Sequence, residues 1–102
     1  MSMLIIVVRE SMLGGVEEFL RTIGVEAYTI MSNVMGKGLH GKVHGTFLSP
    51  DINVVLVTVL PDEQASMVIG ALKSMHDERK AAAHDDHPIP LKVFSYACNE
   101  HV

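Results

Sequence analysis

The chain has 102 residues, of which 48% are hydrophobic and 20% charged, and its formal net charge is -4 at pH 7. This composition is typical of a globular protein and excludes global disorder, and the length suits a single domain over residues 1–102. An acidic chain gains little from a phosphate backbone, so nucleic acid is not an expected partner. Cys98 is the single cysteine, which excludes an intrachain disulfide. We expect a cytoplasmic protein, because no apolar run is long enough to insert into a membrane.

The first half of the sequence predicts a strand, a helix and a second strand. Residues 3–8 are an apolar run rich in β-branched side chains, and its length favours a strand. A helix with one apolar face follows and is expected to end before Gly24. Residues 26–34 alternate imperfectly and are predicted to form a strand. The apolar positions of the helix are Leu13, Val16, Phe19, Leu20 and Ile23.

The second half predicts a long loop, a strand, a helix and a last strand. Residues 35–50 are rich in glycine and have no helical or strand period, so we expect an irregular loop, which at this length is usually functional. Residues 52–60 form another apolar strand. Asp62 is expected to cap a helix that ends near residues 76–77, and residues 91–98 form the last strand. The apolar positions of this helix are Ala65, Val68, Ile69, Leu72 and Met75.

The predicted element order is strand, helix, strand, strand, helix, strand. This order is that of an α+β, ferredoxin-like double βαβ sandwich, with an antiparallel four-stranded sheet and two helices on one face. Strands that face water on their other side should alternate, yet residues 3–8 and 52–60 are apolar on both sides. The second face therefore needs a cover. Another copy of the chain is the simplest cover, so we expect a homo-oligomer.

Several stretches, taken in order, are similar to one known family. They are Ile23-Gly24-Val25, Thr29 to Val34 running into Gly36-Lys37-Gly38, Val57 to Asp62, and Leu91-Lys92-Val93-Phe94. Through them the chain resembles the PII signalling family and its PII-like relatives over nearly its whole length.

The resemblance implies a homotrimer whose sheets face a central axis, with adenine nucleotides bound in clefts between subunits. It also implies that residues 35–50 correspond to the T-loop, through which the family contacts regulated proteins such as transporters and enzymes. Thr29 matches the position that holds the adenine, and Lys92 matches a lysine that contacts phosphate. The ligand positions that the resemblance assigns are Thr29, Gly36, Lys37, Gly38, Val59, Leu60 and Lys92.

One stretch departs from the family pattern. Where the family has Gly-Asp-Gly, whose bare backbone N–H groups cradle phosphates, this chain has Ile89-Pro90-Leu91. Pro90 has no N–H to donate. The departure favours a PII-like variant, and it leaves ATP, ADP, AMP, a cyclic nucleotide, bicarbonate or a metal open as the effector.

The histidines supply a second hypothesis, a module that binds or senses a divalent metal. His40 and His44 are four residues apart, and His84 and His87 flank two aspartates. Imidazole and carboxylate suit zinc, nickel or copper(II), although solvated loop histidines explain the same spacing. The trimeric CutA-type proteins share the broad fold, so architecture does not separate this hypothesis from the first. A purely structural oligomer is a third alternative.

Catalysis has the least support in the sequence. Ser11, Ser32 and Ser49 are scattered and lack the glycine context of a nucleophile elbow. The carboxylates lie mostly on predicted helix faces. We therefore expect a regulatory protein and not an enzyme.

Overall fold

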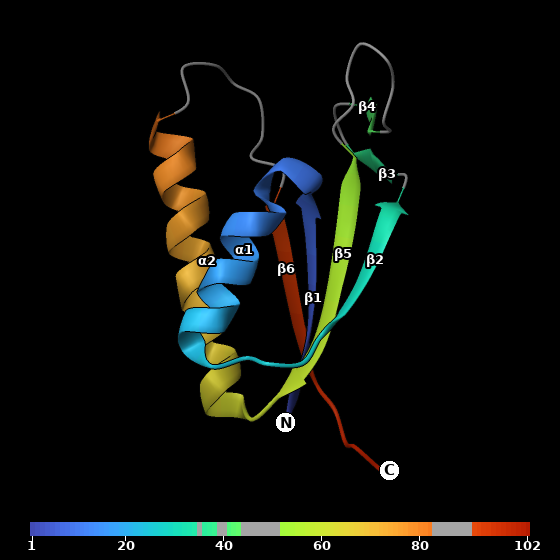
Figure 1. Ribbon diagram of the computed structural model, residues 1–102, viewed down its shortest axis with the longest axis vertical. Helices are drawn as coiled ribbons and strands as arrows, with labels where there is room; N and C mark the ends of the chain where they lie inside the picture. The colour runs from blue at the N-terminus through green and yellow to red at the C-terminus, as the bar shows by residue number, and fades with distance from the viewer. Residues whose placement is uncertain (35, 39–40, 44–51, 83–90) are drawn as a thin grey trace.

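The structure is a four-stranded antiparallel sheet with two helices packed on one face (Figure 1). This computed structural model describes residues 1–34, 36–38, 41–43, 52–82 and 91–102. The strand order is β2-β5-β1-β6, so β2 and β6 are the two edges of the sheet. The predicted α+β, ferredoxin-like fold is confirmed. The elements are β1 (Ser2–Arg9), α1 (Glu10–Ile23), β2 (Thr29–Val34), β5 (Asn53–Leu60), α2 (Asp62–Ala82) and β6 (Leu91–Ala97).

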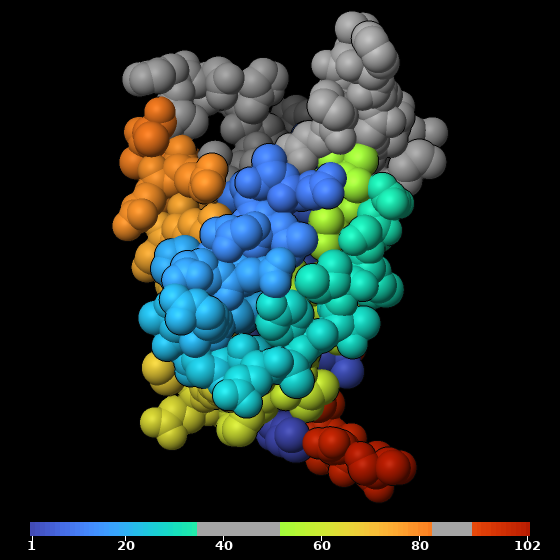
Figure 2. All heavy atoms as spheres, in the orientation of Figure 1, coloured from blue at the N-terminus to red at the C-terminus, as the bar shows by residue number. Residues whose placement is uncertain are grey.

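The hydrophobic core lies between the sheet and the helices. Alternate residues of β1 and β5 point into it, and Leu4, Ile6 and Leu56 are fully buried. Figure 2 shows atoms of α1, α2 and the segment leading into β2 forming a continuous surface over this face. Burying these side chains is the main stabilising contribution to the fold. The helix residues in the core are Met12, Val16 and Leu20 of α1 and Ala65, Val68, Leu72 and Met75 of α2.

The predicted apolar face is confirmed for α2 and partly wrong for α1. Phe19 is 37% exposed, and Met12, which the sequence analysis did not place in the core, is buried. At 100° per residue, Met12, Val16 and Leu20 form a single stripe at i, i+4 and i+8, and Phe19 lies beside it. The pair Gly14-Gly15 obscures this stripe in the sequence, because it interrupts the apolar pattern in the first turns.

Two predicted boundaries are also wrong. α2 continues past residues 76–77 to Ala82, because the added residues are helix formers whose exposed side chains need no core beneath them. β2 begins at Thr29 and not at residue 26. Gly24 ends α1 in the left-handed conformation, with φ 92°, and the chain then crosses from the helix layer to the sheet edge. Asp62 lies in the first turn of α2, one position inside the predicted cap.

A short antiparallel pair lies within the predicted loop. β3 (Gly36–Gly38) pairs with β4 (Gly41–Val43), with Gly36 opposite Val43. The expectation of irregular structure is therefore wrong for these two segments. Backbone pairing needs no alternation of side chains, so a glycine-rich sequence gives no strand period to detect. Figure 1 places this pair at the end of the sheet opposite the two chain termini.

The face of the sheet away from the helices is also apolar, as predicted. We call it the open face. Phe94 and Tyr96 of β6 are 55% and 52% exposed, and Met31 of β2 is 46% exposed. Both helices lie on the other side, so within the described part of the chain this face has no cover. Its apolar residues are Met3, Ile5, Val7, Met31, Val55, Val57, Val59, Phe94 and Tyr96.

Candidate functional site

Two of the ligand positions expected from the sequence, Thr29 and Lys92, lie on the two edges of the sheet. Thr29 begins β2 and is opposite Val57, and Lys92 lies in β6 opposite Val7. Both residues are exposed. The register places both of them on the open face, with β5 and β1 between them. A single copy of the chain therefore does not bring Thr29 and Lys92 together.

Val59 and Leu60 end β5 near the chain termini. Val59 is on the open face and 36% exposed, whereas Leu60 points into the core and is 5% exposed. Leu60 can therefore meet a ligand only through its backbone. Residues 36–38 form β3 at the other end of the sheet. The expected positions are thus separated along the strands as well as across them.

Three hydrogen bonds fix the segment that leads into Thr29. The Val25 backbone N–H donates to the Leu20 carbonyl at 2.8 Å, and the Thr58 hydroxyl donates to the Ala27 carbonyl at 2.9 Å. The Tyr28 hydroxyl donates to Glu17 Oε2 at 2.6 Å, and this hydrogen bond to Glu17 raises the pKa of Tyr28. The three contacts hold the crossing segment against α1 and β5, so β2 begins at a defined place.

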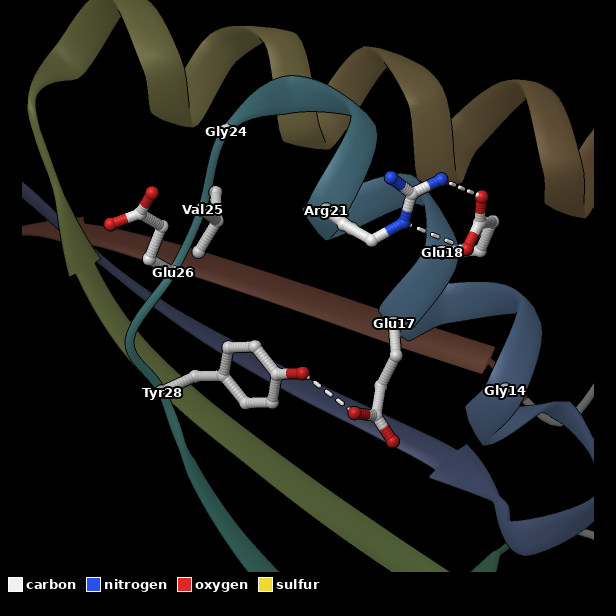
Figure 3. Close-up of a pocket in the computed structure, with 8 residues that line it drawn as sticks. All are labelled: Gly14, Glu17, Glu18, Arg21, Gly24, Val25, Glu26 and Tyr28. Atoms are coloured by element: carbon white, nitrogen blue, oxygen red, sulfur yellow. Dashed lines mark hydrogen bonds and ion pairs between the residues drawn. The ribbon is translucent and has the colours of Figure 1, made fainter.

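A cavity of about 470 Å³ lies between α1 and this segment (Figure 3). Its lining includes the carboxylates of Glu17, Glu18 and Glu26 and one guanidinium, Arg21. Tyr28 and Glu17 point toward each other, whereas Glu26 points away from them. The excess of negative charge disfavours a phosphate ligand. None of the ligand positions expected from the sequence lines this cavity.

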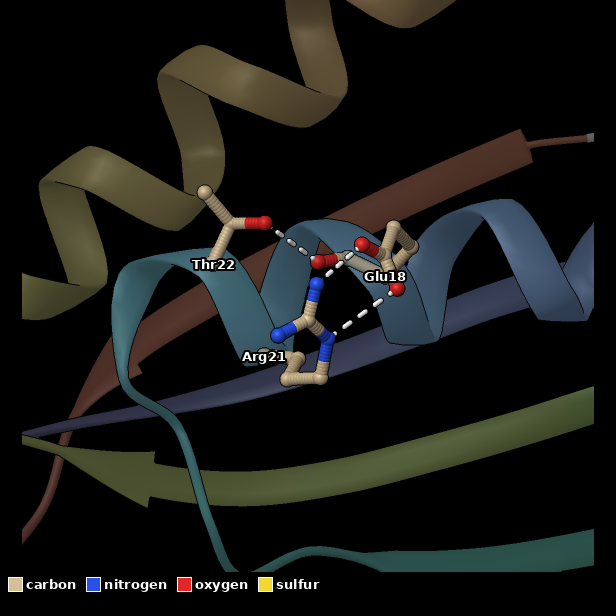
Figure 4. A network of polar contacts seen from close by, with 3 residues as sticks. All are labelled: Glu18, Arg21 and Thr22. Carbon is tan, nitrogen blue, oxygen red and sulfur yellow. Dashed lines mark hydrogen bonds and ion pairs between the residues drawn. The ribbon is translucent and has the colours of Figure 1, made fainter.

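The charges of this cavity are partly paired within α1 (Figure 4). Arg21 donates from Nε to Glu18 at 3.1 Å and also from its second terminal nitrogen, and these bonds lower the pKa of Glu18. The Thr22 hydroxyl donates to the Glu18 carbonyl at 2.9 Å. These side chains are exposed, so the pair contributes little to stability.

A second cavity, of about 260 Å³, lies between α2 and β6. Lys92 lines it together with Lys73 and His76 of α2. The family resemblance assigned Lys92 a phosphate contact, but no sequence pattern predicted Lys73 or His76 beside it. Lys73 and His76 are far from Lys92 in the sequence and approach it only because α2 packs against β6. No local spacing in the sequence therefore predicts that these residues line one cavity.

The predicted metal ligands His40, His44, His84 and His87 lie outside the described residues. In the described part of the chain, no three His, Cys, Asp or Glu side chains are grouped closely enough to hold a metal ion. His76 is the described histidine with a close acidic neighbour, with Nδ1 3.3 Å from Asp77 Oδ1. The metal hypothesis stays a prediction. Separately, no helix among the described residues is long and apolar enough to cross a membrane.

The fold defines a small α+β domain of the ferredoxin-like class, with Thr29 and Lys92, two of its expected ligand positions, on the two opposite sheet edges. The chain matches the nitrogen regulatory protein P-II family over residues 1–97, and it belongs to this family. The resemblance inferred from the sequence is confirmed. A search of curated proteins found no match.

Solved structures of a PII-like protein, CPII from Thiomonas intermedia K12, share the fold. The form bound to ADP, AMP and bicarbonate has a TM-score of 0.74 and 22% identity, over 93% of this chain and 82% of that one. The form bound to ADP and bicarbonate has a TM-score of 0.70 and 23% identity, over 93% and 82%. The apo form has a TM-score of 0.65 and 20% identity, over 93% and 85%.

Proposed function

We propose that this chain is a non-catalytic, cytoplasmic PII-like regulator. It forms a homotrimer, binds an adenine nucleotide between neighbouring copies, and acts on a partner protein through the T-loop at residues 35–50. The observation that carries the proposal is the position of Thr29 and Lys92 at opposite edges of the sheet. A ligand that contacts both must lie where the β2 edge of one copy approaches the β6 edge of the next.

The open face supports the trimer. Phe94, Tyr96 and Met31 leave apolar surface in water, and a patch of this kind marks an interface. Packing the open faces around a shared axis buries this surface and brings unlike edges together. The same contact therefore stabilises the oligomer and completes the nucleotide cleft.

The nucleotide contacts are proposed from both edges. Lys92 is exposed and makes no ion pair with any described carboxylate, so its ammonium group is available for phosphate. Thr29, at the other edge, offers a hydroxyl to the adenine end. The backbone N–H groups of residues 36–38 supply further donors to phosphate. The CPII structures bound to ADP and AMP support an adenine nucleotide as the ligand class.

Regulation follows from differential affinity. The nucleotide must bind one state of residues 35–50 better than another, and the bound state then engages or releases the partner. The partner is proposed to be a transporter or an enzyme, as in the family.

Calorimetric titration of the full chain with ADP tests the proposal. The wild type should bind, and Lys92→Ala should weaken binding by about tenfold to a hundredfold, because a hydrogen-bonded charge contact contributes about 1.5–3 kcal/mol. Lys80→Ala removes an equal charge from the exposed end of α2 and should leave the affinity unchanged. The proposal is wrong if the wild type does not bind ADP, or if the two variants bind equally well.

A further inference from the structure

The cavity between α2 and β6 has an apolar floor and a cationic rim. We call it the α2–β6 groove. Its floor is formed by Ile69 and Leu72 of α2 and by Leu91 and Val93 of β6. Leu72 and Leu91 are buried and close the floor, whereas Ile69 and Val93 are half-buried and remain accessible. Four aliphatic side chains make this floor suitable for an apolar group.

The rim carries Lys73, His76 and Lys92. Neither lysine has a carboxylate partner among the described residues, and both are exposed. The side chain of His76 is 31% exposed, and its Nδ1 lies near Asp77, which leaves Nε2 for another contact. Lys73 and His76 of α2 therefore border one side of an apolar depression, whereas Lys92, whose side chain is on the open face, borders it only along the β6 edge.

We propose that the α2–β6 groove binds a small organic carboxylate with a short aliphatic tail. The tail would lie on the floor and the carboxylate would meet Lys73, with His76 beside it. Inorganic phosphate fits poorly, because a strongly hydrated anion would lose water against the aliphatic floor without gaining polar partners there. A volume of about 260 Å³ limits the ligand to a small molecule. This site lies within one copy of the chain and goes beyond the proposed nucleotide cleft.

The position of the groove also separates it from that cleft. Leu91 and Val93 face the helices, whereas Lys92 shares its side of the sheet with Val7 on the open face. Because β6 is an edge strand, the stem of Lys92 can border both places. Lys73 and His76 border only the groove, so substitutions there test the groove without altering the proposed cleft.

Titration of the full chain with isovalerate, followed by amide chemical shifts, tests the proposal. Isovaleramide has the same shape without the charge, and acetate has the charge without the tail. Isovalerate should bind saturably, with shifts around Ile69, Lys73 and Val93, and both analogues should bind about tenfold more weakly. Equal binding of isovaleramide, or shifts located elsewhere, would contradict the proposal.

Two variants and a control complete the test. Lys73→Gln should weaken isovalerate binding about tenfold, and Ile69→Ala should remove the preference for isovalerate over acetate. Arg79→Gln removes a charge from a different face of α2 and should change neither. The proposal fails if Lys73→Gln behaves like Arg79→Gln. It also fails if ADP displaces isovalerate and its affinity falls in Lys73→Gln, because the groove would then belong to the nucleotide cleft.

The outcome is distinguishable from that of the proposed function. If the wild type binds isovalerate but not ADP, the nucleotide cleft is rejected and the groove is retained. If the wild type binds ADP but not isovalerate, the groove is rejected and the nucleotide cleft is retained.

Discussion

Thr29 and Lys92 lie on the same face of the sheet and on its two opposite edges. Three strand spacings separate the edges, about 14 Å in the hydrogen-bonding direction. The residues that pair across the four strands form rows on the open face. One row is Thr29, Val57, Ile5 and Phe94, and the next row is Met31, Val55, Val7 and Lys92. Neither side chain spans such a gap within one copy, which supports a ligand held between two copies.

The first prediction concerns Phe94, which is 55% exposed on the open face. Phe94→Glu should convert the proposed trimer to a folded monomer, because the carboxylate would be desolvated against an apolar partner surface. Light scattering after size-exclusion chromatography gives the mass, and circular dichroism reports the fold. Met67→Glu is the control, since Met67 is 54% exposed on the helix layer and should leave the mass unchanged. An unchanged mass for Phe94→Glu would contradict the account.

The second prediction contrasts two glycines around α1. Gly24 has φ 92°, and an added Cβ would meet only Gln64, at 3.8 Å, so Gly24→Ala should cost about 1–2 kcal/mol through backbone strain alone. Gly14 is helical and an added Cβ would meet nothing within 4 Å, so Gly14→Ala should stabilise by up to about 1 kcal/mol. Urea denaturation measures both. If both substitutions change the free energy of unfolding in the same direction, the left-handed backbone of Gly24 does not account for its effect.

The third prediction concerns Tyr28, whose pKa is raised by its hydrogen bond to Glu17. A raised pKa means that the bond stabilises the fold below the usual value of 10.0, and that this contribution is lost as the pH rises through the raised value. Glu17→Gln should therefore bring the pKa of Tyr28 back toward 10.0, as measured by NMR of the tyrosine ring. Glu18→Gln is the matched control, because Glu18 pairs with Arg21. If the pKa of Tyr28 changes equally in Glu17→Gln and Glu18→Gln, its hydrogen bond to Glu17 is not the cause of the raised pKa.

The fourth prediction concerns Asp62 at the start of α2. The Ser2 hydroxyl donates to its Oδ1 at 2.7 Å and the Met1 ammonium lies 3.3 Å away, and both lower the pKa of Asp62. The resulting stabilisation is present above the usual carboxyl pKa and is lost as the pH falls through the lowered value. Ser2→Ala should lower the melting temperature at about pH 6 but not at about pH 2. Ser95→Ala, at an exposed serine of β6, is the control and should leave the melting temperature unchanged at both pH values. If Ser2→Ala lowers the melting temperature equally at both pH values, the hydrogen bond from Ser2 to Asp62 is not the cause.

Much of the fold was predictable because its strands and helices carry strong periods. Residues 3–8 are apolar throughout and residues 52–60 are apolar except for Asn53 and Thr58, which predicted both the central strands and the open face. Phe19 was wrongly predicted to be in the core because it is next to Leu20, and the apolar pattern of a single sequence does not distinguish neighbouring positions on a helix face. β3 and β4 were missed because glycine pairing leaves no side-chain pattern. The end of α2 was missed because its last residues, Glu78 to Ala82, are charged or small and carry no apolar stripe.

The site was less predictable than the fold. The resemblance assigned Thr29 and Lys92 to one ligand, yet only the strand order reveals that they belong to different edges. The partnership of Lys92 with Lys73 and His76 depends on how α2 packs against β6, which no local spacing encodes. His40, His44, His84 and His87 remain a prediction, since they lie outside the described residues.

Mixing two variants with weakened ADP binding tests the central claim most directly. Thr29→Leu and Lys92→Ala each remove one side of the proposed cleft, and neither should bind ADP well alone. After the two are unfolded and refolded together, roughly a quarter of the clefts should contain both native residues and recover wild-type affinity, because each cleft takes one residue from each copy. Calorimetry would count these sites, and native mass spectrometry would verify mixed trimers. Mixed trimers without any recovered high-affinity site would contradict a nucleotide cleft built from two copies.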